Sequence, residues 1–121
     1  MGQLKITELK PVQISVEPKT NLLVLRQGDS EVKITRDHVI NMKRLRDGSL
    51  PYDGFTSNLM PRNRFTIDDN GTITITCKDE WEDNEVIVAN HKKLDDLERI
   101  QDFVNKHKRV LAWERDFKDR R

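Results

Sequence analysis

Few side chains in this sequence have the type and spacing that catalysis requires. A nucleophile needs an adjacent base, and the base needs a third group that orients it. None of the three histidines, His38, His91 and His107, stands in a motif with Cys77 or with a serine. The five glycines are dispersed and form neither a dinucleotide-binding fingerprint nor a P-loop. The sequence therefore indicates a non-enzymatic protein, and we expect no catalytic residue and no cofactor.

The metal-ligating residue types do not match a metal site either. His91 and His107 are too far apart to be neighbouring ligands on one helix face, and a lone Cys77 excludes the cysteine pairs of structural zinc sites. The acidic run at 79–85 lacks the alternating ligands and the central glycine of a calcium loop, and Trp81 occupies a ligand position. We expect a solvated acidic turn and no metal.

Charged and aromatic residues remain as candidates for binding a partner. Tyr52 and Phe55 could stack on nucleic-acid bases, and they lie within a basic cluster that could bind phosphate groups. Trp81, surrounded by acids, would be either a core anchor or a binding hot spot for a basic partner protein. The alternative for the basic cluster is an ordinary solvated helix face. Its six members are Arg36, Lys43, Arg44, Arg46, Arg62 and Arg64.

Length and composition narrow the class of protein. A chain of 121 residues predicts a single domain, 1–121. The formal net charge of +1 lacks the overall basicity of an obvious nucleic-acid binder. No segment approaches the roughly 20 apolar residues that span a bilayer, and the first residues lack the apolar core of a signal peptide. We expect a soluble cytoplasmic protein that makes no contact with a membrane.

Several short strands and a helix would position these residues in the first half of the chain. Alternating apolar residues predict strands at 12–16 and 32–34, and residues 22–25 are apolar on both faces, as in a covered central strand. The apolar spacing then becomes helical over about 37–46. From 47 to 63 no period survives, which predicts a loop that could act as a lid.

The second half begins with a hairpin and ends in a helical pattern. Strands at 65–67 and 73–77 flank Asn70–Gly71, a pair that favours a tight two-residue turn with positive φ at both positions. A further strand follows at 86–88. The apolar stripe then predicts a long helix over about 93–118, which would be about 39 Å long at the standard rise per residue.

The end of that helix would outrun a small sheet. Its apolar residues would then need another surface, and a second copy of the chain is the simplest source. As an alternative, the chain bends near Asn105–Lys108 and folds back on the domain. The residues expected to mediate self-association are Val110, Leu111, Trp113 and Phe117.

These elements predict an α+β fold with one antiparallel sheet of about five or six strands and two helices. Segments 22–45 and 72–100 share the order strand, turn, strand, helix, so two ββα units could form an internal repeat. The match lies in periodicity and not in residue identity, which leaves duplication and coincidence both open.

The function predicted from these features is binding of another macromolecule. The first hypothesis is a protein-interaction module, such as an inhibitor or adaptor, with a partner protein of unidentified nature. The alternative is a nucleic-acid-binding protein that uses the basic helix 36–46 and the loop 47–64. The small size and the lack of motifs would also suit a protein encoded by a phage or another mobile element.

Overall fold

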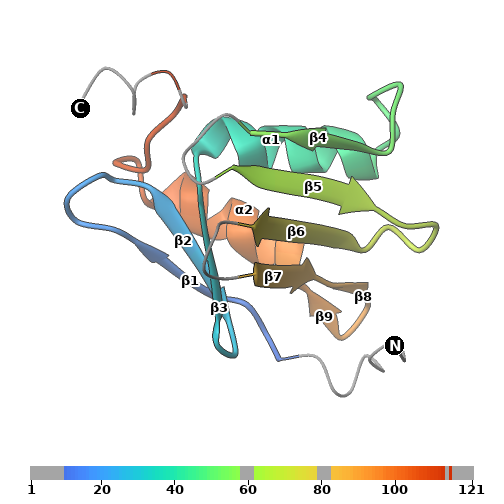
Figure 1. Ribbon diagram of the computed structural model, residues 1–121, viewed down its shortest axis with the longest axis horizontal. Helices are drawn as coiled ribbons and strands as arrows, with labels where there is room; N and C mark the ends of the chain where they lie inside the picture. The colour runs from blue at the N-terminus through green and yellow to red at the C-terminus, as the bar shows by residue number, and fades with distance from the viewer. Residues whose placement is uncertain (1–9, 58–61, 79–82, 114, 116–121) are drawn as a thin grey trace.

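The computed structural model describes residues 10–57, 62–78, 83–113 and 115 of the chain. This part forms two helices and three antiparallel sheets, with strand orders β1–β2–β3, β4–β5–β6–β7 and β8–β9 (Figure 1). The predicted α+β class with two helices and antiparallel pairing is confirmed. In chain order the elements are β1 (Gln13–Val16), β2 (Leu23–Gln27), β3 (Ser30–Ile34), α1 (Arg36–Arg46), β4 (Gly54–Thr56), β5 (Asn63–Ile67), β6 (Ile73–Lys78), β7 (Asp83–Val88), β8 (Asn90–His91), β9 (Leu94–Asp95) and α2 (Asp96–Lys106).

Strands β1 to β3 form a meander and lie where the sequence predicted strands, at 12–16, 22–25 and 32–34. β2 pairs antiparallel with both neighbours, and the connection Gly28–Asp29 closes the second hairpin at the pair Gln27–Ser30. Gly28 has a φ of 61°, a left-handed conformation that glycine adopts at little cost. Leu23 and Leu25 alternate onto one face of the sheet and are fully buried.

Strands β5 and β6 form the predicted hairpin, but its turn is of another kind. The backbone of Asp68 donates to Thr72 and accepts from Gly71, so three residues cross the turn and not two. Gly71 has a φ of 80°, whereas Asn70 does not have a positive φ. The Asp68 carboxylate accepts hydrogen bonds from the backbone N–H groups of Asn70 and Thr72. This local bonding by an aspartate side chain explains the wider turn.

The outer strands β3 and β7 lie side by side, and side chains join them where a main-chain ladder would be expected. The Gln27 amide donates to the carbonyl of Ile87 at 3.1 Å and accepts from its N–H at 2.9 Å. Ser30, the hairpin partner of Gln27 on β3, accepts from the N–H of Glu85 with its hydroxyl at 3.2 Å. We call this junction the seam.

Two asparagines complete the seam from the other side. The Oδ1 of Asn84 accepts from the backbone N–H of Glu31 at 3.1 Å. The Nδ2 of Asn63 donates to the carbonyl of Lys33 at 2.8 Å. Positions 31 and 33 are the outward-facing backbone groups of β3, so the edges of both strands find hydrogen-bond partners here.

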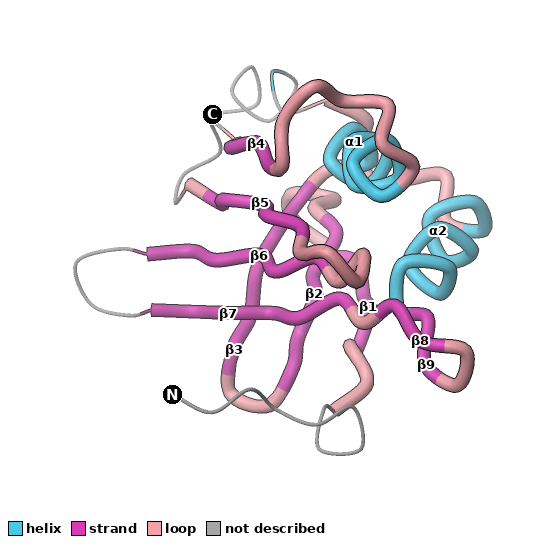
Figure 2. Tube along the Cα trace, turned by 90° about the vertical axis from the view of Figure 1, so that its right-hand side faces the viewer, coloured by secondary structure: helices cyan, strands magenta, loops and turns pink. Residues whose placement is uncertain are grey.

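The seam explains why the predicted single sheet of five or six strands is wrong. β3 and β7 contact each other through side chains, so the pairing stops at each strand and two sheets result. The strands of the three-stranded sheet run across those of the four-stranded sheet (Figure 2). A sequence pattern shows which residues alternate, but it does not show that an amide side chain will take the place of a neighbouring strand.

Both helices lie on one side of the four-stranded sheet (Figures 1 and 2). One hydrophobic core joins them to both larger sheets. The helices contribute apolar side chains at helical spacing, as predicted. Fully or almost fully buried members of this core are Leu23, Leu25, Ile34, Val39, Met42, Phe65, Ile73, Ile75, Leu97 and Ile100.

The order strand, strand, helix occurs twice, in β2–β3–α1 and in β6–β7–α2. The second unit differs because the β8–β9 hairpin stands between its strand and its helix. Leu94, expected to begin the helical stripe, therefore lies on β9.

The C-terminal helix is much shorter than the predicted 93–118, because α2 ends at Lys106. Both the N–H and the Nδ1 atom of His107 bond to the carbonyl of Phe103. The Arg36 guanidinium donates hydrogen bonds to the carbonyls of Val104 and His107. The chain then turns back, which was the alternative considered for this segment.

The seam predicts that Gln27→Ala will destabilise the fold. The change leaves the N–H and carbonyl of Ile87 without their partners, and we expect a loss of about 2 kcal/mol in the free energy of unfolding. Urea unfolding measures this loss, and the Ile87 amide should exchange faster with solvent. Gln13→Ala on exposed β1 is the matched control and should change stability by less than about 0.5 kcal/mol. Equal stability of the two variants would contradict the role of the seam.

Candidate functional site

Arg36 and Arg46, two members of the predicted basic cluster, hold the two helices together. Arg36 at the start of α1 donates to the carbonyls of Val104 and His107 at the end of α2, at 3.0 and 3.1 Å. Arg46 at the end of α1 donates to the Asp95 carboxylate at the start of α2, at 2.8 Å. The helices are therefore antiparallel. Positive charge at the carboxyl end of α2 also offsets the helix dipole there.

The Arg46–Asp95 ion pair perturbs the titration of Asp95. Burial acts to raise the pKa of Asp95, but the Arg46 guanidinium and the backbone N–H groups of Glu98 and Leu97 outweigh it. The net effect lowers the pKa of Asp95 below its ordinary value. Asp95 is also the N-cap of α2 and accepts from the N–H of Glu98 at 3.1 Å. The Asp95 carboxylate therefore both caps α2 and connects it to α1.

The other four cations of the cluster are exposed, but they lie on two sides of the sheet. Lys43 and Arg44 are on α1, which packs on the inner face of the four-stranded sheet. Arg64 is on the outer face, and Arg62 just precedes β5. The structure therefore does not bring the six predicted cations together on one surface.

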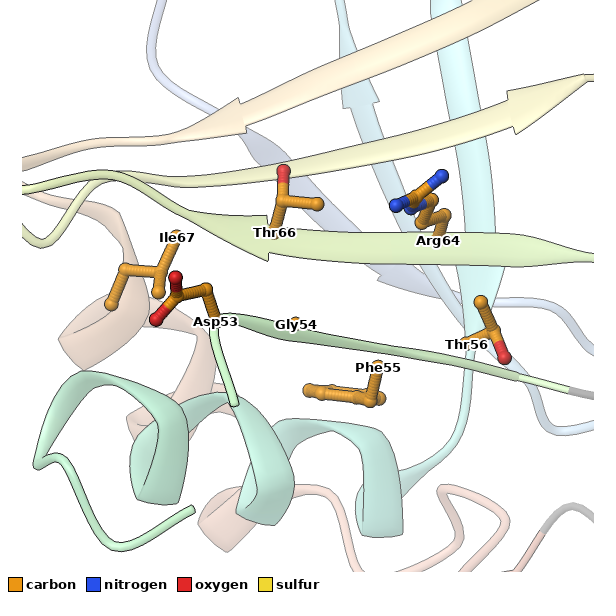
Figure 3. A pocket seen from close by; sticks show the side chains of 7 residues that line it. All are labelled: Asp53, Gly54, Phe55, Thr56, Arg64, Thr66 and Ile67. Carbon is orange, nitrogen blue, oxygen red and sulfur yellow. The ribbon is translucent and has the colours of Figure 1, made fainter. Parts of the chain in front are cut away.

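The two loop aromatics also separate. Tyr52 is 54% exposed. Phe55 points toward α1 (Figure 3) and stacks on Phe65, with ring centroids 4.4 Å apart and an interplanar angle of 12°. Phe55 therefore contributes to packing, and Tyr52 is the member of this pair that faces solvent.

The remaining predicted residues divide in a similar way. Val110 is buried in the main core, and Leu111 is buried against Leu22. Trp113 is 48% exposed. Trp81 and Phe117 lie outside the residues that the structure describes.

The backbone around Leu111 also serves the fold. The carbonyls of Leu111 and Ala112 accept from the N–H groups of Arg36 and Asp37, which belong to the first turn of α1. These N–H groups have no partner within the helix. Part of the segment expected to bind a second copy is therefore used inside the chain.

The outer edge of β4 carries backbone groups that the described part of the fold leaves open. Backbone hydrogen bonds at Asp53 and Ser57, of 3.0 and 2.8 Å, tie β4 to β5 at its two ends. Because the bonding direction alternates along a strand, Phe55 also faces β5, and Gly54 and Thr56 face away. Among the described residues, the N–H and carbonyl groups of Gly54 and Thr56 have no hydrogen-bond partner.

A glycine is required where β4 meets β5. A Cβ atom on Gly54 would lie 2.4 Å from the carbonyl oxygen of Phe65. Real Cβ atoms essentially never approach this closely, and the obstacle is backbone, which cannot rotate away. A larger residue at this position would therefore push β4 off the sheet.

The missing side chain at Gly54 leaves a shallow hollow of about 420 Å³ beside the open edge. Figure 3 shows Asp53 next to Ile67 at one end, and Arg64 near Thr56 at the other. Arg64 has no hydrogen-bond or ion-pair partner among the described residues. The lining residues are Asp53, Gly54, Phe55, Thr56, Arg64, Thr66 and Ile67.

Sequence reasoning found part of this site and missed the rest. It singled out Phe55 and Arg64 and treated 47–63 as a loop, whereas this segment contains β4. This strand, Gly54–Thr56, contains a single large apolar residue, Phe55, so it shows no alternation of apolar residues. The signal that was present is Gly54 next to Phe55 and Thr56, two residue types that favour strands. A glycine in a strand often marks a close approach of two backbones.

Two further findings concern other site types. No group of three histidine, cysteine or acidic side chains within the described ranges could hold a metal ion. Neither of the two described helices is long and apolar enough to cross a membrane.

The Arg46–Asp95 pair predicts a stability that depends on pH. Asp95→Asn keeps an N-cap acceptor and removes the charge, so we expect a loss of about 1 kcal/mol at neutral pH. Because the folded pKa is lowered, the stabilisation is fully present above the unfolded pKa of about 4 and is lost as the pH falls through the folded pKa. Urea unfolding of both proteins between neutral and acid pH measures this.

The stabilities of the wild type and Asp95→Asn should therefore converge in acid. Lys43→Ala is the control, because Lys43 forms an exposed ion pair with Asp47 on the same helix. That change should lower the free energy of unfolding by only about 0.3 kcal/mol. A difference between wild type and Asp95→Asn that stays constant with pH would contradict the role of the Asp95 charge.

Comparisons with protein-family models, with curated proteins and with solved structures gave no match, so the function has to be argued from the geometry of the chain itself.

Proposed function

We propose that this protein is a non-enzymatic binding module that binds an extended peptide segment of a partner protein at the outer edge of β4. The open backbone groups of Gly54 and Thr56 carry this proposal. An unpaired strand edge can accept another strand, and the main-chain hydrogen bonds then supply affinity. The hollow beside Gly54 offers a place for one of the added side chains. An inhibitor or an adaptor would act through such binding.

The other strand edges are less suited to this role. The side chains of the seam already bond to five of the outward-facing backbone groups of β3 and β7: the N–H and carbonyl of Ile87, the N–H groups of Glu31 and Glu85, and the carbonyl of Lys33. β1 is the remaining outer strand of the three-stranded sheet, and prolines stand two residues outside each of its ends, at Pro11 and Pro18. Prolines at such positions discourage a further strand from pairing.

The alternative, nucleic-acid binding by the basic helix, has weaker support in the geometry. Phosphate contacts need several cations on one face. Arg36 and Arg46 bond within the fold, and Arg64 lies across the sheet from Lys43 and Arg44. Phe55 stacks on Phe65 on the side of the sheet that faces the helices, so its ring does not face solvent as base stacking would require.

The experiment is a selection from a displayed library of random linear peptides on the immobilised full-length chain. Thr56→Pro removes the outward N–H of Thr56 and leaves the hydrogen bonds to β5 in place. We expect it to weaken the selected peptides by about tenfold or more, the effect of losing one or more main-chain hydrogen bonds. Thr56→Ala keeps the N–H and should lose much less affinity. Peptide binding should also shift the amide resonances of Gly54 and Thr56.

Two results would contradict the proposal. In the first, the selected peptides bind equally well to the wild type and to Thr56→Pro, and they shift amide resonances away from Gly54 and Thr56. The other is sub-micromolar, salt-sensitive binding of an oligonucleotide that Lys43→Ala with Arg44→Ala abolishes, which would favour the nucleic-acid alternative. A spectrum of folded Thr56→Pro, with the core resonances unmoved, ensures that lost binding is not lost folding.

A further inference from the structure

We infer that the hollow beside Gly54 selects an acidic side chain, so that the peptide bound at β4 carries an aspartate or glutamate whose carboxylate meets Arg64. This inference rests on the proposed function, because it names the chemistry of the segment that the β4 edge would take.

The geometry brings such a side chain within reach of Arg64. In the sheet, Gly54 stands opposite Thr66, and Thr56 stands opposite Arg64. A strand added to β4 would lie about 10 Å from β5, which is two strand spacings. Arg64 therefore meets a carboxylate on the added strand by extending its long side chain across the face of β4. At Gly54 no side chain stands in the way, and an added side chain can therefore lean into the hollow.

The charge of Arg64 is available for a partner. Arg26, Arg36, Arg46 and Arg99 all donate to oxygen atoms of the chain, whereas Arg64 is exposed and has no such bond within the described residues.

No charged residue is paired directly with Arg64 on the strands beside β5, and the nearest described acid in this register, Glu85, stands two strands away. The neighbours of Arg64 on the adjacent strands are Thr56 and Thr76, which carry no charge. An arginine fork matches a carboxylate with two parallel hydrogen bonds, and the hydroxyl groups of Thr56 and Thr66 can donate from the walls of the hollow.

Asp53 makes the hollow selective along its length. Its carboxylate lies beside Ile67, at the end opposite Arg64 (Figure 3). An acidic side chain is repelled from that end and attracted to the other. The hollow therefore favours one register of an acidic peptide over its neighbours, and a basic side chain gains nothing near Arg64.

The test uses the peptides selected on the wild-type chain. We expect them to share an aspartate or glutamate at one position, and changing that residue to glutamine or asparagine should weaken binding by about tenfold. Arg64→Gln should remove the difference between the acidic peptide and its amide counterpart. Arg64→Glu should reverse it, with a lysine peptide preferred. Arg44→Gln is the control, because Arg44 is also exposed and has no hydrogen-bond or ion-pair partner among the described residues but lies on α1, so the acidic preference should remain.

Failure of the inference differs from failure of the proposed function. If Thr56→Pro abolishes binding but acidic and amide peptides bind equally well to the wild type, the edge binds peptides and the acidic preference is refuted. If the preference survives in Arg64→Gln, another cation supplies it, and the inference is overturned. If Thr56→Pro has no effect on any selected peptide, the proposed function itself falls, and the inference falls with it.

Discussion

The seam between β3 and β7 determines which parts of this fold remain open. Four side chains, those of Gln27, Ser30, Asn63 and Asn84, bond to backbone groups that a continuous ladder between β3 and β7 would have used. Several outward-facing backbone groups of both strands are therefore paired although the ladder stops there. The four-stranded sheet is closed at one edge as a consequence, and its opposite edge, β4, is where backbone groups still face outward.

The helices add a second constraint that moves charge away from the surface. Arg36 and Arg46 stand at the two ends of α1 and bond to the two ends of α2. Their positive charges are thereby committed to the antiparallel helix pair. This leaves the exposed cations of the predicted basic cluster divided between α1, the outer face of β5 and the residue just before β5. A local function for Arg64 in the hollow fits that division better than a broad basic surface does.

The sequence predicted the strands and helices whose apolar residues recur at a regular spacing, because burial of one face imposes that spacing directly. The predictions from sequence were wrong where hydrogen bonds of individual side chains determine the structure. Asp68 widened a turn, Gln27 and its partners divided one sheet into two, and Arg36 with His107 ended α2 early. The candidate site was only partly predictable, since β4 contains a single large apolar residue and Gly54 reveals its role only through the nearby carbonyl of Phe65.

Amide hydrogen exchange of the free, full-length protein tests the central claim most directly, because it reports whether the β4 edge is open. Our account predicts an alternation: the N–H groups of Phe55 and Ser57, which face β5, should exchange slowly, and those of Gly54 and Thr56 should exchange quickly. Protection of Gly54 and Thr56 equal to that of Phe55 would mean that the edge is already paired, and it would contradict the proposal that this edge awaits a partner.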